Sequence, residues 1–285
     1  MLSMSPTAEW FSRVWGGERD GAPVVFLHGF WGDSRDWEPI AEQVAAEHPC
    51  LAVDLPGHGR TPWPTAGDAY GFHSLAADLA RFLDDRGIAK AIVAGYSMGG
   101  RIALYFALEY PRRVAALVLE SASPGLRCEA ERPARRAWEA EWARALETER
   151  IDAVLERWYD QALFASLRQN PTLLAGMKTR RREANPTGLA MAIRCLGAGA
   201  QRPLWDRLSE LSPPTLAIAG RGDPKYVDIV EAMPEVQPHL HTRIMEGCGH
   251  NTHAEDPVGY ARVLREFVIN TGVLRDESNS MGINR

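Results

Sequence analysis

The stretch from residue 91 to residue 106, AIVAGYSMGGRIALYF, places a serine between two glycines where an apolar run meets a helical one. Gly95, Ser97 and Gly99 fit the pattern G-x-S-x-G, in which a serine occupies a sharp turn between a strand and a helix. A serine held there has strained backbone angles, so small residues have to flank it. Because AIVAG favours a buried strand and GGRIALYFALEY favours a helix, the sequence predicts a nucleophile elbow at Ser97.

Short apolar runs alternate with helical stretches through most of the rest of the chain. Runs this short and this apolar are typical of strands that are buried on both faces, as in a parallel sheet covered by helices. The alternation therefore predicts an α/β protein with a mostly parallel, doubly wound sheet. We expect strands at 23–29, 50–57, 91–97, 114–122, 215–223 and 241–247, and helices at 36–47, 73–86, 98–110 and 254–270.

Residues 124–205 interrupt this alternation. The segment is dense in Arg, Glu, Trp and Ala at helical spacing and contains no convincing strand. A structureless loop of this length would be unusual in a compact domain, so we predict a helical cap. The predicted core then consists of residues 1–123 and 206–271, and the polar residues 272–285 are predicted to form a flexible tail.

Composition limits the classes of protein that the sequence could encode. A length of 285 residues suits one large α/β domain with an insertion. The formal net charge of −5 does not favour nucleic-acid binding, and no apolar run approaches the length of a membrane span. The N-terminal sequence lacks the basic and apolar regions of a secretory signal, which predicts a cytoplasmic protein. The four cysteines are scattered singly, so we expect neither a disulfide framework nor a metal site.

The elbow predicts two further catalytic residues, because a serine hydroxyl is nearly inert at neutral pH unless a base takes its proton. With this motif the acid and the histidine follow the serine in that order. Asp223 follows the apolar run TLAIAGRG, and His250 follows HTRIMEG. Both lie at the C-terminal ends of expected strands, where open α/β sheets place their sites. We predict a triad of Ser97, Asp223 and His250, and we prefer His250 to His253, which lies at the start of the last helix.

Negative charge that develops beside the serine needs hydrogen-bond donors aimed at it. The backbone N–H of Met98, at the start of the helix, is one predicted donor. The backbone N–H of Phe30, in the loop after PVVFLHG, is the other. Asp54 and His58, in the stretch DLPGHG, are interpreted as turn residues rather than as catalysts.

Arg101 lies four residues after Ser97, so the two side chains share one face of the helix near its N-terminus. A cation there opposes the helix dipole, at a cost of about 0.3–1 kcal/mol. One interpretation is a structural ion pair with an Asp or Glu. The other is a bound anion beside the serine, held by a contact of roughly 1.5–3 kcal/mol.

The predicted cap carries two arginine clusters, at 127–136 and at 180–182. One arginine from each cluster would be enough to complete a pocket for a polyanion, which favours the second interpretation of the arginine beside the elbow. Trp158, Tyr159 and Phe164 would form the apolar wall of that pocket or the core of the cap.

Several segments taken together resemble one family. They are FLHGFWGDSRDW, VDLPGHG, GYSMGGR, ESASPGL, WYDQALFASL, NPTGLA, LWDRLSEL, GRGDPKY and GCGHNTH, and they extend over about residues 23–268. In this combination the chain is similar to the 2-succinyl-6-hydroxy-2,4-cyclohexadiene-1-carboxylate synthases of menaquinone (vitamin K2) biosynthesis, which have the α/β-hydrolase fold. The most specific parts are the arginine after the elbow and the segment WYxQxxFxSL.

The resemblance implies a lyase that eliminates pyruvate from 2-succinyl-5-enolpyruvyl-6-hydroxy-3-cyclohexene-1-carboxylate. The triad would remove a ring proton, with no acyl-enzyme and no cofactor, and arginines would hold the three carboxylates of the substrate. The expected partner is thus a small polycarboxylate rather than a nucleic acid or a membrane, and the protein is expected to be a monomer or a small homo-oligomer. By similarity, the substrate-binding residues are Tyr96, Arg101, Arg135, Trp158 and Arg181.

Two positions depart from the family pattern. Arg221 replaces an acid close to Asp223, and Trp31 is bulky where a small residue is common, so both bear on the shape of the pocket. A serine carboxylesterase or carbon–carbon bond hydrolase acting on an anionic substrate is the alternative enzyme, and a non-catalytic ligand receptor is the alternative outside enzymes. The sequence does not decide which cap arginines face the pocket. In one cluster the choice is between Arg180 and Arg181, and in the other it is between Arg132 and Arg135.

Overall fold

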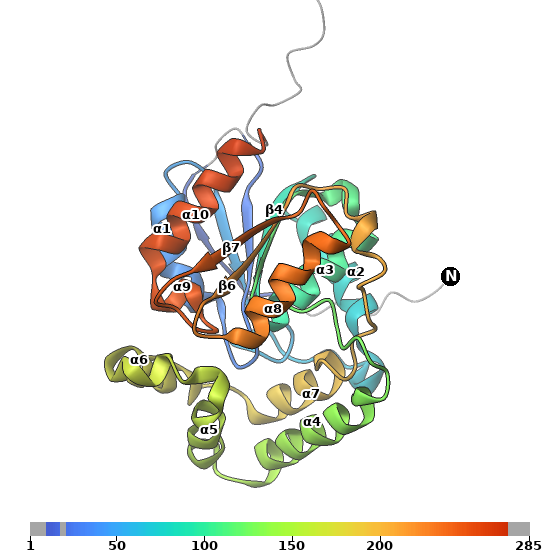
Figure 1. Ribbon diagram of the computed structural model, residues 1–285. Helices are drawn as coiled ribbons and strands as arrows, with labels where there is room; N and C mark the ends of the chain where they lie inside the picture. Colours follow the sequence, from blue (N-terminus) through green and yellow to red (C-terminus); the bar gives the residue numbers. More distant parts are fainter. Residues whose placement is uncertain (1–9, 18–20, 273–285) are drawn as a thin grey trace, which may run out of the picture.

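The computed structural model of the protein describes residues 10–17 and 21–272. A seven-stranded sheet of order β1-β3-β2-β4-β5-β6-β7 forms its centre (Figure 1). Every neighbouring pair of strands is parallel except β1 and β3, which confirms the prediction of a mostly parallel α/β sheet. The strands are β1 (Ser12–Trp15), β2 (Val24–Leu27), β3 (Cys50–Val53), β4 (Ala91–Tyr96), β5 (Val114–Glu120), β6 (Thr215–Gly220) and β7 (His241–Met245).

The antiparallel edge strand β1 is not predicted from the sequence. It pairs from Ser12 opposite Val53 to Trp15 opposite Cys50. All four of its residues are partly or fully exposed, so the strand lacks the continuous apolar run that marks the buried strands. Four residues are also too few to establish a periodic pattern.

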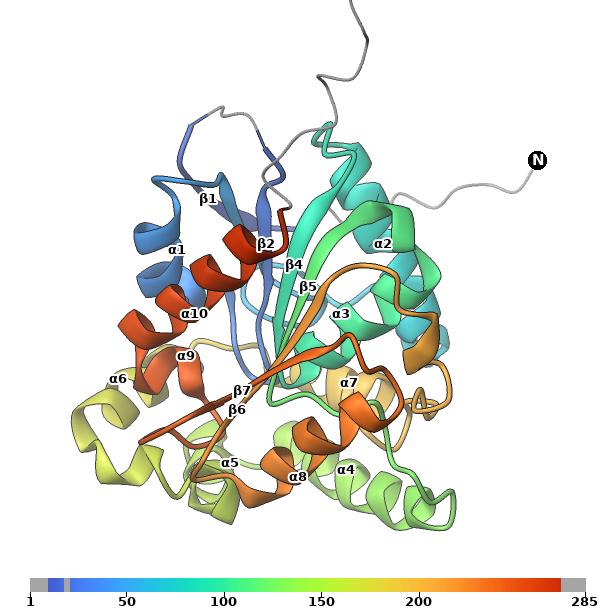
Figure 2. The ribbon, with the colours of Figure 1, turned by 45° about the horizontal axis from the view of Figure 1, so that its top comes forward.

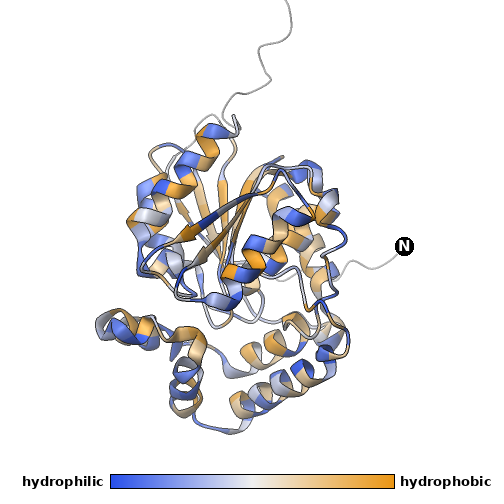
Figure 3. Cartoon of the chain, viewed as in Figure 1, coloured by the Kyte–Doolittle hydropathy of each residue, from blue (hydrophilic) through white to orange (hydrophobic). Residues whose placement is uncertain are grey.

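Helices cover both faces of the sheet (Figures 1 and 2). On one face the apolar side chains of β2 and β3 pack with α1 and α10, and on the other face they pack with α2 and α3. β2 and β3 are therefore apolar along their whole length, and the central strands are mostly orange in Figure 3. The helices are α1 (Glu38–Val44), α9 (Thr252–Glu255) and α10 (Pro257–Asn270) on the first face, and α2 (Phe72–Asp84), α3 (Met98–Glu109) and α8 (Pro224–Ala232) on the second.

The expected helix at 254–270 is divided into α9 and α10. Pro257 has no backbone N–H and disfavours a helical conformation of the residue before it, so the first helix ends at Glu255. The side chain of Asp256 then accepts a hydrogen bond from the Gly259 N–H at 2.9 Å and caps the second helix.

A third group of helices lies against the end of the sheet that is lowest in Figure 1. It consists of α4 (Glu131–Thr148), α5 (Ile151–Asp160), α6 (Pro171–Arg181) and α7 (Pro186–Leu196). All of residues 124–205 are described, and none of them forms a strand. We refer to this segment as the cap. Its division from the core at these residues stays a prediction, and positions 273–285 of the predicted tail lie outside the described residues.

Short 3-10 helices connect the longer elements. They are η1 (Ser34–Trp37), η2 (Gly67–Ala69), η3 (Pro111–Arg113), η4 (Ala162–Phe164), η5 (Leu167–Gln169), η6 (Leu208–Glu210) and η7 (Met233–Glu235). No helix within the described part of the chain is both long enough and apolar enough to cross a bilayer.

The cap contacts the core backbone to backbone at two glycines. Gly57 lies in the loop after β3, and Gly188 lies in the first turn of α7. A Cβ atom on Gly57 would lie 2.5 Å from the Gly188 carbonyl oxygen, and one on Gly188 would lie 2.6 Å from the Gly57 carbonyl oxygen. Gly57 also has a φ of +80°, a conformation that favours glycine. Both positions therefore require glycine.

Candidate active site

Ser97 occupies the turn between β4 and α3, with φ of +51° and ψ of −108°. A positive φ is uncommon for a residue with a side chain and marks a strained backbone. Gly95 and Gly99 flank the turn so closely that a Cβ on Gly95 would collide with the Gly99 carbonyl oxygen. A Cβ on Gly99 would in turn collide with the carbonyl oxygen of Leu27 in β2. The two glycines thus let the serine project at the end of the strand.

Ser97, His250 and Asp223 form a continuous hydrogen-bonded chain. Nε2 of His250 lies 3.1 Å from Oγ of Ser97, and Nδ1 lies 2.7 Å from Oδ2 of Asp223. Asp223 and His250 follow β6 and β7, and both are buried. A proton on Nδ1 that is donated to the carboxylate leaves Nε2 free to accept the proton of the serine hydroxyl. The structure therefore brings the three predicted triad residues together in the geometry that activates a serine.

One predicted backbone donor, Met98, directly follows the serine, and the other, Phe30, lines the same cavity as the serine. Met98 is the first residue of α3, so its N–H has no partner within the helix. The N–H of Phe30 takes part in none of the hydrogen bonds that the described residues form. Phe30 belongs to a tight turn in which the Gly32 N–H donates to the Gly29 carbonyl oxygen at 3.0 Å.

A cavity of about 40 Å³ lies between the elbow and the cap. Ser97 and His250 line it from the core, and the predicted binding residues Tyr96, Trp158 and Arg181 line it as well. Arg101 and Arg135 do not. The sequence analysis left two roles open for three aromatic residues, the wall of the pocket or the core of the cap. The structure places them in both: Trp158, Tyr159 and Phe164 line the cavity and belong to the buried cluster of the cap.

Arg101 is a buried cation without an acid partner. Its relative exposure is 9%, and it forms no ion pair within residues 10–17 and 21–272. Nη1 lies 3.4 Å from Oε1 of Gln201, and the guanidinium lies 5.7 Å from the ring centre of Phe72. Burial lowers its pKa to about 10, opposed by the nearby Tyr226 and Glu139 side chains. The structural ion pair considered from the sequence is therefore absent from the described residues.

Arg135 of α4 lies close enough to Arg101 to lower its pKa further. The Nε atom of Arg135 is 2.7 Å from the buried Oε1 of Glu139, and its guanidinium is 4.2 Å from the ring centre of Trp138. Arg132 instead pairs with the exposed Glu129 at 3.2 Å. Of these two cap arginines, Arg135 is the one whose charge acts on the pKa of Arg101.

Arg181 and Arg180 differ in burial. The Arg181 side chain is 4% exposed and lies 2.5 Å from Oδ2 of Asp36, whereas the Arg180 side chain is 34% exposed. Arg181 Nε and Nη1 are buried and have no hydrogen-bond partner. Sequence reasoning missed its acid partners Asp36 and Asp33, although their spacing in GDSRDW, at the capping box of η1, was a signal that could have identified them.

His253, the rejected alternative base, belongs to a separate buried network that the sequence analysis did not predict. Its Nδ1 lies 2.7 Å from Oε2 of Glu120, and its backbone N–H and the Thr252 hydroxyl both donate to Oε1 of Glu120. The imidazole ring stacks on Trp37 with centres 4.2 Å apart and packs edge-on against Tyr96. The histidine that contacts the serine is thus His250.

The sequence analysis also discussed Asp54, His58 and Arg221, and the structure shows the surroundings of each. Asp54 accepts hydrogen bonds from the backbone N–H groups of Ser34 and Arg60, which matches its interpretation as a turn residue. His58 is fully buried, and burial lowers its pKa to about 3, so the ring is neutral near neutral pH. Arg221 is exposed and pairs with Glu246 at 3.1 Å.

Trp31 fills space between the core and the cap. It is 1% exposed and has a φ of +65°, and its Nε1 donates to the Arg181 carbonyl oxygen at 3.1 Å. The bulky residue at this position therefore supports the backbone of the cap next to Arg181. Among the described residues, no group of three or more His, Cys, Asp or Glu side chains is arranged to hold a metal ion.

Comparison with known proteins places this site in a family. Residues 22–257 match the model of the α/β-hydrolase fold family. The 2-succinyl-6-hydroxy-2,4-cyclohexadiene-1-carboxylate synthase of Salmonella heidelberg (strain SL476) is 36% identical over 254 residues, which cover 87% of this chain and 94% of the relative. The enzyme of the same name from Serratia proteamaculans (strain 568) is 32% identical over 257 residues, covering 90% and 96%.

A solved structure agrees with the sequence comparison. The structure of MenH from S. aureus superimposes with a TM-score of 0.86 at 30% identity and covers 91% of this chain and 98% of its own. The likeness thus includes the cap as well as the core. The chain belongs to the α/β-hydrolase fold family and, within it, to the 2-succinyl-6-hydroxy-2,4-cyclohexadiene-1-carboxylate synthase family.

Proposed function

We propose that this protein is a carbon–oxygen lyase of menaquinone biosynthesis. It eliminates pyruvate from 2-succinyl-5-enolpyruvyl-6-hydroxy-3-cyclohexene-1-carboxylate and so forms 2-succinyl-6-hydroxy-2,4-cyclohexadiene-1-carboxylate. The names of the relatives support this reaction, and so does the arrangement of charged groups around the serine. A cytoplasmic location and a monomeric or small homo-oligomeric state remain predictions from the sequence.

The proposed mechanism is a proton abstraction without an acyl-enzyme. Asp223 holds the His250 ring with Nδ1 towards the carboxylate, so Nε2 accepts the proton of the Ser97 hydroxyl. The serine oxygen then removes the ring proton of the substrate, and the electron pair of the broken C–H bond forms the new ring double bond as the C–O bond breaks. The enolpyruvyl group leaves as the enolate of pyruvate, which takes up a proton on carbon to become pyruvate. The backbone N–H groups of Phe30 and Met98 stabilise negative charge that develops on the substrate.

The observation that carries the proposal is the burial of Arg101 without an acid. Taking a cation out of water is expensive unless an opposite charge offsets it. Arg101 lies next to Tyr226, whose ring centre is 4.7 Å from that of the catalytic His250. A carboxylate of the substrate would supply the missing opposite charge. Arg135, which also pairs with Glu139, and Arg181, which also pairs with Asp36, would contact the other carboxylates.

Pyruvate release tests the proposed reaction directly. The purified protein should release pyruvate from the enolpyruvyl substrate with saturation kinetics, measured by a coupled lactate dehydrogenase assay. It should hydrolyse neutral esters such as p-nitrophenyl acetate only slowly, because a neutral ester offers no charge to the arginines. Efficient ester hydrolysis without pyruvate release would instead support the serine carboxylesterase or carbon–carbon bond hydrolase.

Replacing Arg101 with methionine should separate these two enzyme functions. We expect kcat/KM for pyruvate release to fall by roughly 10–100-fold, because one charge-assisted contact to the substrate is lost. The folded protein should be at least as stable as the wild type, because an unpaired buried cation is replaced by an apolar side chain of similar length. The matched control is Arg112→Met at an exposed arginine, which should leave both quantities unchanged. Full activity of Arg101→Met on the enolpyruvyl substrate would contradict the assigned role of Arg101.

A further inference from the structure

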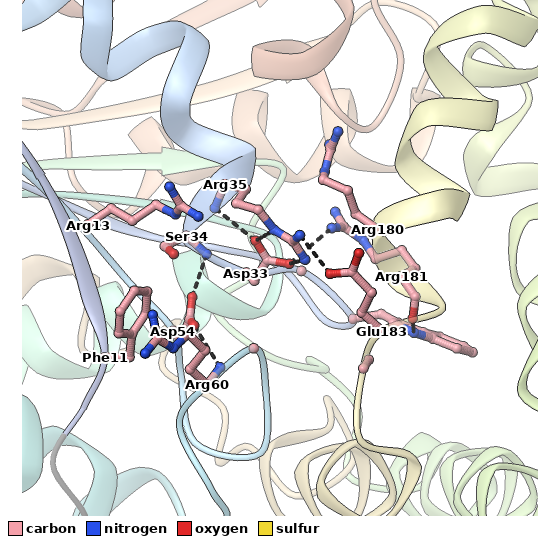
Figure 4. Close-up of a pocket in the computed structure, with 14 residues that line it drawn as sticks. Phe11, Arg13, Asp33, Ser34, Arg35, Asp54, Arg60, Arg180, Arg181 and Glu183 are labelled. Atoms are coloured by element: carbon pink, nitrogen blue, oxygen red, sulfur yellow. Dashed lines mark hydrogen bonds and ion pairs between the residues drawn. The ribbon is translucent and has the colours of Figure 1, made fainter.

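A second cavity, of about 220 Å³, lies beside the loop that carries Phe30 (Figure 4). It is lined by four segments that are far apart in the sequence: residues 11–13, 31–35, 54–60 and 180–184. Gly32 and Arg181 line both this cavity and the one over the serine, so the two are neighbours. Neither Ser97 nor His250 lines the second cavity.

The acids that line the second cavity already have partners. Asp33 and Glu183 hold Arg35 at 2.9 and 2.7 Å. Asp54 accepts two backbone N–H groups, at 2.7 and 2.8 Å, as Figure 4 shows. Arg181 is held by Asp36, which does not line this cavity. The lining therefore has little negative charge left for any further cation.

Two of the lining arginines have no acid partner. Arg13 and Arg60 form no ion pair within the described chain, and the Arg60 guanidinium lies 4.1 Å from the ring centre of Phe11. In Figure 4 both side chains lie at the same side of the cavity. The buried Nε atoms of Arg13, Arg180 and Arg181 also lack hydrogen-bond partners. Buried polar groups without partners are rare, so each of these donors calls for an explanation.

The lining contains five arginines and three carboxylates, in a chain whose formal net charge is −5. Asp36, which lies outside the lining, pairs with Arg180 at 3.4 Å and with Arg181 at 2.5 Å, so the positive charge left without an ion pair is that of Arg13 and Arg60. Positive charge of this kind in a concave site attracts anions. A cavity of this size has room for a compact anion. Phe11 and Trp31 add apolar walls, which favours a carbon skeleton over an inorganic ion.

We propose that this cavity binds a small organic polyanion, a di- or tricarboxylate, at a site separate from the active site. Arg13 and Arg60 hold it from the core, and Arg180 holds it from the cap. A ligand bound there joins α6 of the cap to the core next to the loop that carries Phe30. The inference does not depend on the reaction proposed above.

Calorimetric titration of the full-length protein with citrate tests the site. We expect Arg13→Ala/Arg60→Ala to weaken citrate binding by about tenfold or more, since two charge-assisted contacts are lost. The same double variant should release pyruvate with unchanged kcat/KM. The matched control, Arg112→Ala/Arg262→Ala, removes two exposed arginines outside the cavity and should bind citrate as the wild type does. Circular dichroism checks that each variant is folded, and Arg60→Glu provides a second, single-site change that should also weaken binding.

The active site is a competing location for citrate, and Arg101→Met distinguishes the two. Binding that survives in Arg101→Met and is lost in Arg13→Ala/Arg60→Ala supports the second site. The reverse pattern, or equal binding in the two double variants, overturns the proposal. Titration with pyrophosphate separates the ligand classes: tighter binding of pyrophosphate than of citrate would replace the organic polyanion with an inorganic one.

Discussion

Ser97→Ala is expected to lower kcat for pyruvate release by about 10²–10⁴-fold, the range that a positioned general base contributes. The variant keeps His250 and Asp223 in place but removes the oxygen that lies 3.1 Å from Nε2 of His250. KM should change little, because the arginines that are proposed to bind the carboxylates remain. The loss of rate is measured by continuous detection of pyruvate at saturating substrate.

Ser121→Ala is the matched control for this experiment. Ser121 is also a buried serine with a positive φ, +45°, directly after the neighbouring strand β5. Its hydroxyl has no hydrogen-bond partner, so its removal should leave kcat within about twofold of the wild type. A fall in the control as large as that in Ser97→Ala would show that the effect comes from the fold and not from the reactive hydroxyl.

Intact-protein mass spectrometry during turnover adds a second readout for Ser97. The proposed elimination forms no covalent bond to the enzyme, so no adduct should accumulate on the wild type with the enolpyruvyl substrate. An acyl adduct on Ser97 that forms and decays at the rate of turnover would favour nucleophilic catalysis, as in the esterase alternative.

Glu120→Ala should lower the free energy of unfolding by about 3–5 kcal/mol, the usual cost of breaking a buried, hydrogen-bonded pair. Glu120 has no exposed surface and accepts hydrogen bonds from the Thr252 hydroxyl and the His253 N–H. Both donors, together with the His253 ring, would be left in an apolar interior without this partner. Urea denaturation followed by circular dichroism measures the change.

The control for Glu120→Ala is Glu147→Ala. Glu147 contacts Arg194 through two bonds of 2.5 and 2.7 Å, but both side chains are about one third exposed. An exposed ion pair contributes roughly 0–1 kcal/mol, so this variant should be much less destabilised. Equal losses in the two variants would mean that the buried network around Glu120 contributes no more to stability than a surface pair.

The sheet and the elbow could be predicted from the sequence because their signals are local. An apolar run marks a strand wherever both of its faces are buried, and β1 was missed because its residues are only partly buried. The elbow could be predicted because glycines are required within two residues of Ser97. Pro257 was also a local signal for the division between α9 and α10, but the helix predicted at 254–270 included this proline.

The partners of the buried charged residues could not be predicted in the same way. Glu120 and His253 are 133 residues apart, and Asp36 and Arg181 are 145 residues apart. Only the tertiary fold decides which acid meets which base. The same limit applies to Arg101, whose lack of an ion pair with any described acid depends on what α3, α8 and the cap place around it. The arginines of the cap favoured one of its two interpretations, but spacing along the chain could not decide between them.

The touching backbones of Gly57 and Gly188 have a consequence for protein engineering. Grafting the cap of another α/β hydrolase onto this core would bring a new residue to position 188. Anything larger than hydrogen there would push α7 away from the loop after β3, because the Cβ would lie 2.6 Å from the Gly57 carbonyl oxygen. Chimaeras should therefore assemble only from donors that also supply glycine at this junction, whatever the rest of their sequence.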